Sequence, residues 1–281
     1  MAMKLKKSLQ IIEKYKNENP HYIDLLDILG DILVLREEFV RKEMQEDVFH
    51  VDTKYIANKI EGGMPLVDFE QEMNLEFPEK YFHALLKAME DKLPEYVDAV
   101  RLQMQSDKLS YKDLLLKYLS LDNAKELPLD DIDSDEEMSF DLISMLLRES
   151  LRPGFEKLIA KHKKFLEKHE WKEGFCPICG NQPKIGEIKG EEGHRHLYCY
   201  QCGYEWLFPR IMCPFCGNSD HQSLLYFTVE GNEHYRVDTC NVCKQYIKIV
   251  DIRELKQDTN LEVEDIATLH LDILANEEGY E

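Results

Sequence analysis

The chain has 281 residues, a formal net charge of −20 and a mean hydropathy of −0.47. This length predicts about two domains, and a hydrophobic share of 43% supports a buried core and excludes a wholly disordered chain. So acidic a chain repels phosphate backbones, which argues against nucleic-acid binding. No apolar run can span a bilayer, and residues 1–18 lack the apolar stretch of a secretory signal. We therefore expect a cytoplasmic protein without a membrane partner.

The negative charge is spread unevenly along the chain. Residues 174–253 carry 8 basic and 9 acidic side chains, whereas residues 254–281 carry 1 and 9. The charge argument against nucleic acid is therefore weakest for the near-neutral stretch 174–253.

Residues 1–170 contain no cysteine and have the apolar spacing of amphipathic helices. One helix is predicted from His21 to about Asp47, where Leu25, Leu29 and Val40 recur at helical intervals. Further helices are predicted over 78–91, 94–106, 109–120, 138–150 and 153–169, with boundaries near Pro78, Pro94, Pro128 and Pro153. Because short connections join antiparallel helices, the prediction for residues 1–170 is an all-α bundle.

The acidic run from Asp130 to Glu137 has the composition of a calcium loop but not its pattern. A loop that begins at Asp131 requires Gly at its sixth position and Glu at its twelfth, where this chain has Glu136 and Leu142. Ser134 followed by Glu137 is instead a capping box, which predicts the start of a helix.

The composition changes at Trp171. Residues 174–253 contain all eight cysteines together with strand-like stretches at 195–198, 224–229 and 246–251. A polar linker follows Leu255, and an amphipathic helix is predicted from about Glu262 to Asn276.

The eight cysteines form four C-x-x-C pairs. Two such pairs place four thiolates around one tetrahedral ion, so four pairs predict two ions. Proline within two of these loops and glycine after them favour the tight turns that aim backbone N–H groups at sulfur. The predicted metal ligands are Cys176, Cys179, Cys199, Cys202, Cys213, Cys216, Cys240 and Cys243.

Internal repetition indicates how the pairs combine. The motif Cys-Pro-x-Cys-Gly-Asn begins at Cys176 and recurs at Cys213, and each copy is followed by a second pair with aromatic neighbours. A tandem duplication is the simplest interpretation, in which the first two pairs bind one ion and the last two bind the other. An interleaved arrangement, with the first pair joining the third, remains open.

Other thiol chemistry fits the pattern less well. Structural disulfides conflict with the reducing cytoplasm, and a thioredoxin-like dithiol needs one motif rather than four. Four sulfurs suit iron and zinc alike, so the sequence leaves both open. It also leaves open whether the ions only stabilise the fold or whether iron there is redox-active.

Several residues near the cysteines are candidates for a partner surface. We propose that basic and aromatic side chains bind an acidic partner segment, although core packing and ordinary surface charge are the alternatives. These candidates are Arg195, Trp206, Arg210, Arg236 and Lys248. Four nearby histidines (194, 196, 221 and 234) are expected to lie outside full four-sulfur shells. No phosphate loop, zinc-protease motif or nucleophile elbow is present, so we expect no catalysis and no small-molecule substrate.

The cysteine-rich part resembles the formate dehydrogenase accessory protein family, FdhE. The residues that carry the resemblance are Cys-Pro-Ile-Cys-Gly at 176–180, Arg-His-Leu-Tyr-Cys-Tyr-Gln-Cys at 195–202, Glu-Trp at 205–206, Arg210, Cys-Pro-Phe-Cys at 213–216, Asp-Thr-Cys-Asn-Val-Cys at 238–243, Tyr-Ile-Lys-Ile at 246–249 and the terminal segments 264–272 and 278–280. The resemblance covers about 174–280, and the helical half agrees only in general character.

The resemblance implies an α+β multidomain fold. An N-terminal helical bundle (1–170) is expected to precede two rubredoxin-like or zinc-ribbon modules (171–212 and 213–253) and a linker with a C-terminal helix (254–281). It also implies a cytoplasmic maturation factor that contacts the catalytic subunit of formate dehydrogenase and holds two ions of iron or zinc. The alternatives are a rubredoxin-like electron-transfer protein and a nucleic-acid-binding zinc ribbon.

Overall fold

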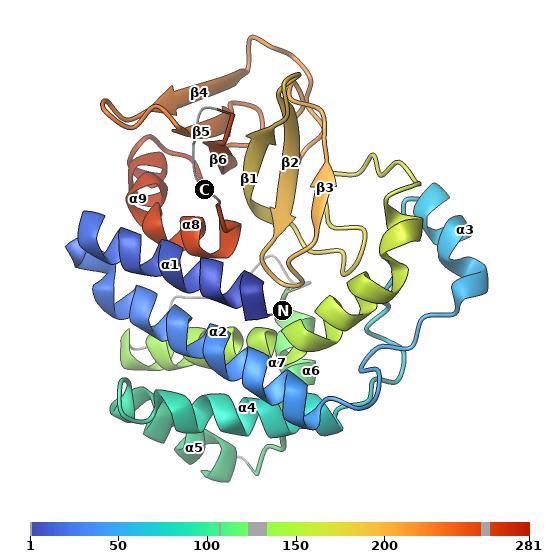
Figure 1. Cartoon of the computed structure of the whole chain (residues 1–281), viewed down its shortest axis with the longest axis vertical. Helices are drawn as coiled ribbons and strands as arrows, with labels where there is room; N and C mark the ends of the chain where they lie inside the picture. Colours follow the sequence, from blue (N-terminus) through green and yellow to red (C-terminus); the bar gives the residue numbers. More distant parts are fainter. Residues whose placement is uncertain (1, 107, 123–133, 254–258) are drawn as a thin grey trace. The chain divides into compact units, whose positions relative to one another are not determined.

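The computed structural model describes residues 2–106, 108–122, 134–253 and 259–281, and it combines helices with one mixed sheet (Figure 1). By its internal contacts the chain divides into two compact units. The first unit comprises residues 1–30, 51–68 and 159–281, and the second comprises residues 31–50 and 69–158. The first unit therefore takes segments from both sides of residue 170. The four-part division drawn from the sequence stays a prediction.

Most helices of the N-terminal half lie where the apolar spacing predicts them. They are α1 (Ala2–Glu18), α2 (Ile23–Glu43), α3 (Ile56–Glu61), α4 (Glu76–Met89), α5 (Pro94–Ser106), α6 (Tyr111–Asp122) and α7 (Ser134–Leu166). Two short 3-10 turns, η1 (Pro20–Tyr22) and η2 (Thr53–Tyr55), precede α2 and α3. Helix α5 begins at Pro94, as predicted. Proline is tolerated in the first turn of a helix, because the backbone N–H that it lacks would have no hydrogen-bond acceptor within the helix there.

The predicted helix boundary at Pro153 is wrong, since α7 continues through this residue. A proline inside a helix costs about 3 kcal/mol, because it removes a hydrogen bond and crowds the preceding turn. Leu151 and Phe155 flank it and are fully buried, and burial of two such side chains contributes about 3–6 kcal/mol. Tertiary packing therefore outweighs the local preference. Helix α7 does begin at Ser134, the predicted cap, while Asp130 to Asp133 lie outside the described residues.

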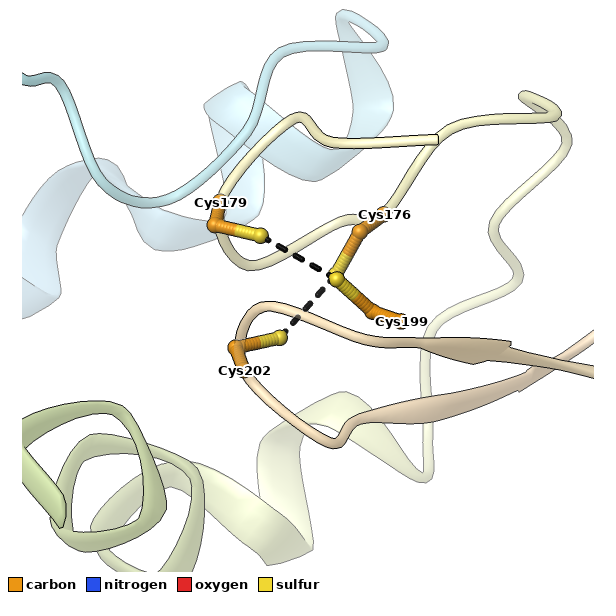
Figure 2. Close-up of side chains that lie close together, drawn as sticks. All are labelled: Cys176, Cys179, Cys199 and Cys202. Atoms are coloured by element: carbon orange, nitrogen blue, oxygen red, sulfur yellow. Dashed lines mark hydrogen bonds between the residues drawn. The ribbon is translucent and has the colours of Figure 1, made fainter. Parts of the chain in front are cut away.

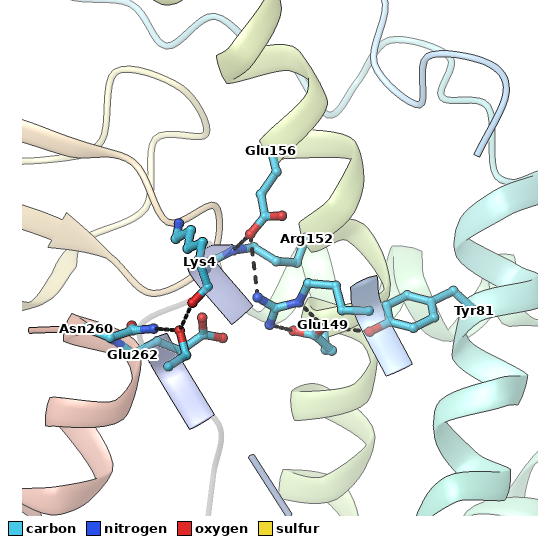
Figure 3. A network of polar contacts seen from close by, with 9 residues as sticks. Lys4, Tyr81, Glu149, Arg152, Glu156, Asn260 and Glu262 are labelled. Atoms are coloured by element: carbon cyan, nitrogen blue, oxygen red, sulfur yellow. Dashed lines mark hydrogen bonds and ion pairs between the residues drawn. The ribbon is translucent and has the colours of Figure 1, made fainter. Parts of the chain in front are cut away.

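The second unit is built around aromatic and aliphatic side chains and one buried ion pair. Tyr81, Phe82 and Phe155 are fully buried. Arg36 donates from Nε and Nη2 to the two carboxylate oxygens of Glu149 at 2.7 and 2.6 Å. The Tyr81 hydroxyl donates to the same carboxylate at 2.9 Å (Figure 3). Every charge in this cluster has a partner, as burial requires.

The cysteine-rich part forms a single six-stranded sheet. Its strands are β1 (Pro183–Lys189), β2 (His194–Cys199), β3 (Glu205–Leu207), β4 (Leu224–Thr228), β5 (Tyr235–Cys240) and β6 (Tyr246–Asp251), in the order β3-β2-β1-β6-β5-β4. Each predicted module contributes three antiparallel strands. The two halves join through parallel pairing of β1 with β6. The two predicted modules therefore share one continuous hydrogen-bonded sheet.

Helices α8 (Leu261–Ala267) and α9 (Leu269–Glu277) cover one face of this sheet (Figure 1). Leu261 and Leu271 from these helices pack with Ile185, Val237 and Val250 from three strands. The sequence predicted one helix here. Thr268 ends α8, and its hydroxyl donates to the backbone oxygen of Glu264 at 2.7 Å. The linker residues 254–258 lie outside the described part.

Helix α1 packs against α8 within the first unit. The Tyr15 hydroxyl lies 2.5 Å from that of Tyr235 on β5, and both hydroxyls donate to Glu264 Oε2, at 2.6 and 2.7 Å. Asn260 caps α8 and donates to Ser8 on α1 at 2.7 Å (Figure 3). The N-terminal helix therefore belongs with the metal-binding part of the fold, which its sequence did not reveal.

Candidate metal centres

The first centre brings together four cysteines from two turns. Cys176 and Cys179 lie on the loop before β1, Cys199 ends β2, and Cys202 lies on the turn from β2 to β3 (Figure 2). The Sγ atoms of Cys176 and Cys202 are 3.4 Å apart, as are those of Cys179 and Cys199. All four sulfurs lie within 4.8 Å of one another.

These separations fit one tetrahedral ion. Bonds of about 2.3 Å from metal to sulfur place tetrahedral sulfurs ~3.8 Å apart. In the second centre the Cys213–Cys243 and Cys216–Cys240 sulfurs are 3.6 and 3.7 Å apart. Small movements of the turns would therefore complete both shells, and both four-cysteine groups can hold a metal ion.

The same backbone turn recurs at each C-x-x-C pair. The residue after the second cysteine has a positive φ in all four: Gly180 at 82°, Gly203 at 70°, Gly217 at 72° and Lys244 at 61°. Glycine adopts this conformation without strain, so Lys244 is the departure from the pattern. The N–H groups of Cys176 and Cys213 donate to Asn181 and Asn218 backbone oxygens at 2.8 Å each. The two asparagines therefore have matching roles in the two modules.

The sulfurs group as the tandem duplication predicts, not in the interleaved arrangement. The two centres differ in exposure. All four cysteines of the first centre are buried. In the second, Cys213 and Cys240 are buried, Cys243 is partly exposed and Cys216 is exposed. The second centre therefore has a face open to solvent.

Burial makes ionisation of the cysteine thiols in the first centre unfavourable when no cation is bound. It raises the pKa values of the Cys176 and Cys179 thiols well above the ordinary range, because a thiolate there loses its hydration. In the second centre burial acts in the same direction on Cys240, but backbone N–H groups of Cys243 and Val242, together with the Asn218 and Cys243 side chains, outweigh it and lower the pKa of Cys240 to about 7. A bound cation would provide the positive charge that four adjacent thiolates require.

The predicted partner-binding residues occupy different environments. Arg195 and Lys248 are 2% and 1% exposed, and Trp206 is also buried. Lys248 Nζ lies 2.7 Å from Asp265 and 2.6 Å from Asp272, so its charge is compensated within the chain. Arg210 is exposed and Arg236 is partly exposed. Partner binding by these residues stays a prediction, and only the last two present charge at the surface.

No histidine joins either group of potential ligands within the described residues. His194 and His221 lie at the surface, where they approach the neighbouring carboxylates of Glu192 and Asp220. His196 on β2 is partly buried, and burial lowers its pKa.

Gly174 has a structural role that the sequence alone did not indicate. A Cβ atom added at Gly174 would lie 1.8 Å from the backbone oxygen of Pro214, inside the third C-x-x-C loop. The chain before the first centre therefore packs directly against a turn of the second. Nothing in the local sequence marks this glycine, because its requirement arises from a residue 40 positions later.

Together, the helical N-terminal half and a sheet that presents two four-cysteine groups define a class of metal-thiolate proteins with two centres. No helix in the described ranges has the length and apolar character needed to cross a bilayer.

Comparison with known proteins shows similarity to FdhE proteins. Residues 175–210 match the model described as FdhE, central domain, and residues 211–281 match FdhE, C-terminal domain. Protein FdhE homolog of Aquifex aeolicus is 28% identical over 277 residues, which cover 97% of this chain and 91% of that protein. Protein FdhE homolog of Pseudomonas aeruginosa is 34% identical over 112 residues, or 37% of this chain and 36% of that protein.

The crystal structure of the FdhE protein from Pseudomonas aeruginosa has the same fold. Its TM-score is 0.69 at 22% identity, with 99% of this chain and 91% of that chain covered. The resemblance to the FdhE family seen in the sequence is confirmed: residues 175–281 match both of its domain models, and the chain is similar in sequence and fold to FdhE proteins.

Proposed function

We propose that this protein is an accessory factor that binds the catalytic subunit of formate dehydrogenase and supports its maturation. The observation that carries the proposal is the match of residues 175–281 to both FdhE domains, with both four-cysteine groups assembled. The resemblance to the formate dehydrogenase accessory protein family implies that the protein acts on formate dehydrogenase without being the enzyme itself. We therefore propose binding rather than catalysis, in the cytoplasm, where thiols stay reduced.

The two centres would each hold one ion of iron or zinc. The residues that would bind the first are Cys176, Cys179, Cys199 and Cys202, and those for the second are Cys213, Cys216, Cys240 and Cys243. Four thiolates fill a tetrahedral shell and leave no open position for water, which suits a structural role. The ions would fix the turns that connect the strands of each module.

A binding measurement tests the proposal. The metal-loaded protein is immobilised and exposed to the purified catalytic subunit of formate dehydrogenase from the same organism, with an unrelated redox enzyme as control. We expect saturable binding of the formate dehydrogenase subunit alone. Equal retention of both enzymes, or of neither, contradicts the proposal.

The exposed second centre supports one other candidate, a redox function. Cys216 is open to solvent, so an iron ion there would lie close to the surface, as electron transfer requires. Protein reconstituted with iron should then be red and bleach reversibly on reduction. Colour that does not respond to reductant excludes this candidate.

A further inference from the structure

A cleft of about 480 Å³ lies on the face of the sheet opposite α8 and α9. We call it the linker cleft, because the segment that joins the two modules forms one wall. The other walls come from β4, β5 and β6. Its lining includes Arg210, Met212, Phe215, Tyr226, Arg236 and Ile247.

Strand register explains why these side chains share a face. Asp238 on β5 pairs with Tyr226 on β4 and with Ile247 on β6, so all three point to the same side. Val237 precedes Asp238 and points to the opposite side, into the core with α8 and α9. The cleft is therefore the surface left open on the second half of the sheet.

The floor of the cleft holds two guanidinium groups and one carboxylate. Asp238 lies 3.3 Å from Arg195 Nη1 and 2.8 Å from Arg236 Nε. Arg195 also donates to the backbone oxygens of Pro209 and Met212, which fixes the linker. Its buried Nε–H has no acceptor among the described residues. Asp238 is the only acidic side chain among the described residues that line the cleft.

The charge of a bound ion must be included in this balance. Four thiolates around a divalent ion carry a net formal charge of two negative units. Cys213 and Cys240 line the cleft, so Arg195 and Arg236 would also offset the second centre. These two arginines are therefore occupied by Asp238 and the metal centre.

Arg210 is the cation that remains for a ligand. It is exposed, and it forms no ion pair with any carboxylate in the described part of the chain. A Cβ atom added at Gly193 would lie 3.1 Å from Arg210 Nη1 and 2.9 Å from Arg253 Nη1. Arg253 is already paired with Asp251 at 2.6 Å. Arg210 and Arg253 therefore approach the same glycine, and because only Arg253 has a carboxylate partner, an anion would neutralise Arg210.

Exposed apolar side chains border the same cleft. Ile211 and Tyr226 are 63% and 66% exposed. The guanidinium of Arg236 lies 5.2 Å from the centre of the Tyr226 ring, which holds the ring beside the cleft. Tyrosine and arginine at a concave surface are the residue types that dominate binding energy in protein interfaces.

We propose that the linker cleft docks an extended acidic segment of a partner protein. A carboxylate of that segment binds Arg210, and a neighbouring large apolar side chain packs against Ile211 and Tyr226. The complementarity of charge favours this occupant, because Arg210 borders the cleft and has no carboxylate partner in the described part of a chain with a net charge of −20. The proposal rests on the proposed function only for the identity of the partner.

Two variants test the cleft, and each has a matched control. Arg210→Glu reverses the free cation, and Arg41→Glu makes the same change at an exposed position of the other unit. Tyr226→Ala removes the exposed ring, and Tyr55→Ala removes a ring that is 59% exposed outside the cleft. Metal content and circular dichroism establish that each variant retains the fold.

The first probe is a fluorescein-labelled 12-residue peptide of the repeat Asp-Phe-Glu-Leu, titrated into metal-loaded protein and followed by fluorescence anisotropy. The second is the purified catalytic subunit of formate dehydrogenase. We expect Arg210→Glu and Tyr226→Ala to weaken binding of both probes by about tenfold or more, and both controls to change it less than about twofold. The repeat Asn-Phe-Gln-Leu should bind more weakly than the acidic peptide.

The two probes separate the two proposals. If the catalytic subunit binds but Arg210→Glu and Arg41→Glu weaken it equally, the cleft proposal is overturned and the proposed function stands. If the subunit does not bind at all while the peptide distinguishes the variants, the proposed function fails and the cleft stands. Equal peptide affinity in every variant overturns the proposal that the cleft docks an acidic segment. Displacement of the peptide by a single-stranded oligonucleotide at equal concentration overturns it as well.

Discussion

The two metal centres should differ in how fast their sulfurs react. In the second centre the Cys216 side chain is exposed, so a thiol reagent or chelator can reach it in the folded protein. In the first centre Cys176, Cys199 and Cys202 have no exposed surface. Reaction there requires the module to open.

The free energy needed to open the first module determines the expected ratio of the two reaction rates. The first centre lies against buried strands of the sheet, so its opening free energy approaches that of unfolding, about 5 kcal/mol at the lower end for a domain. At one factor of ten for each 1.4 kcal/mol, Cys216 should react more than about 1,000 times faster than Cys176. The ion in the second centre should be lost first to a chelator.

Isotope-labelled iodoacetamide and peptide mass spectrometry measure this ratio in protein treated with EDTA. Metal analysis at each time point follows the release of the first and second ion. Simultaneous alkylation of both centres, or earlier alkylation of the first, would refute the reasoning from burial. Chemically denatured protein is the control, in which all eight cysteines should react at similar rates.

Three further substitutions, two of them with a matched control, test contacts outside the metal centres. Lys248→Met leaves two carboxylates without their buried partner and should cost about 3–5 kcal/mol in urea denaturation, whereas Lys184→Met removes an exposed lysine from Asp265, which keeps Lys248, and should cost under ~1 kcal/mol. Gly174→Ala should destabilise the protein by ~2 kcal/mol or more through its clash with Pro214. Gly30→Ala in α2, where a Cβ meets only ordinary contacts at 3.8 Å, should leave stability unchanged or raise it. Burial raises the pKa of the Glu264 carboxyl in the folded protein, so the folded state keeps a proton that the unfolded state releases above pH ~4.3. The free energy of unfolding should therefore fall as the pH rises from ~4.3 to the raised pKa of the folded state. Glu264→Gln should remove this pH dependence in thermal melts, and an unchanged pH profile contradicts the assignment.

The sequence predicted the local features of the metal-binding part because its ligands repeat at short range. Each C-x-x-C pair forms one turn, and the Cys-Pro-x-Cys-Gly-Asn repeat by itself indicates the tandem grouping of the sulfurs. Helices such as α4 and α5 were predicted because their apolar spacing extends over several turns.

Long-range contacts explain what the sequence did not reveal. The parallel joint between β1 and β6 links residues about 60 positions apart, and no local pattern specifies it. Glu264 was assigned only to a terminal helix, yet it accepts hydrogen bonds from Tyr15 and Tyr235. Lys248 was considered a surface cation and is instead buried between two aspartates. Pro153 lies within α7 because its neighbours are buried, which helix propensity alone does not describe.

The central claim is that eight thiolates form two separate tetrahedral metal centres. Native mass spectrometry of protein purified without air, combined with X-ray absorption at the iron and zinc edges, measures the number of ions and their ligands together. The account predicts two ions per chain, each bound by four sulfurs at ~2.3 Å, and no disulfide. A single ion per chain, a shell with nitrogen or oxygen ligands, or cysteines oxidised to one another would contradict it.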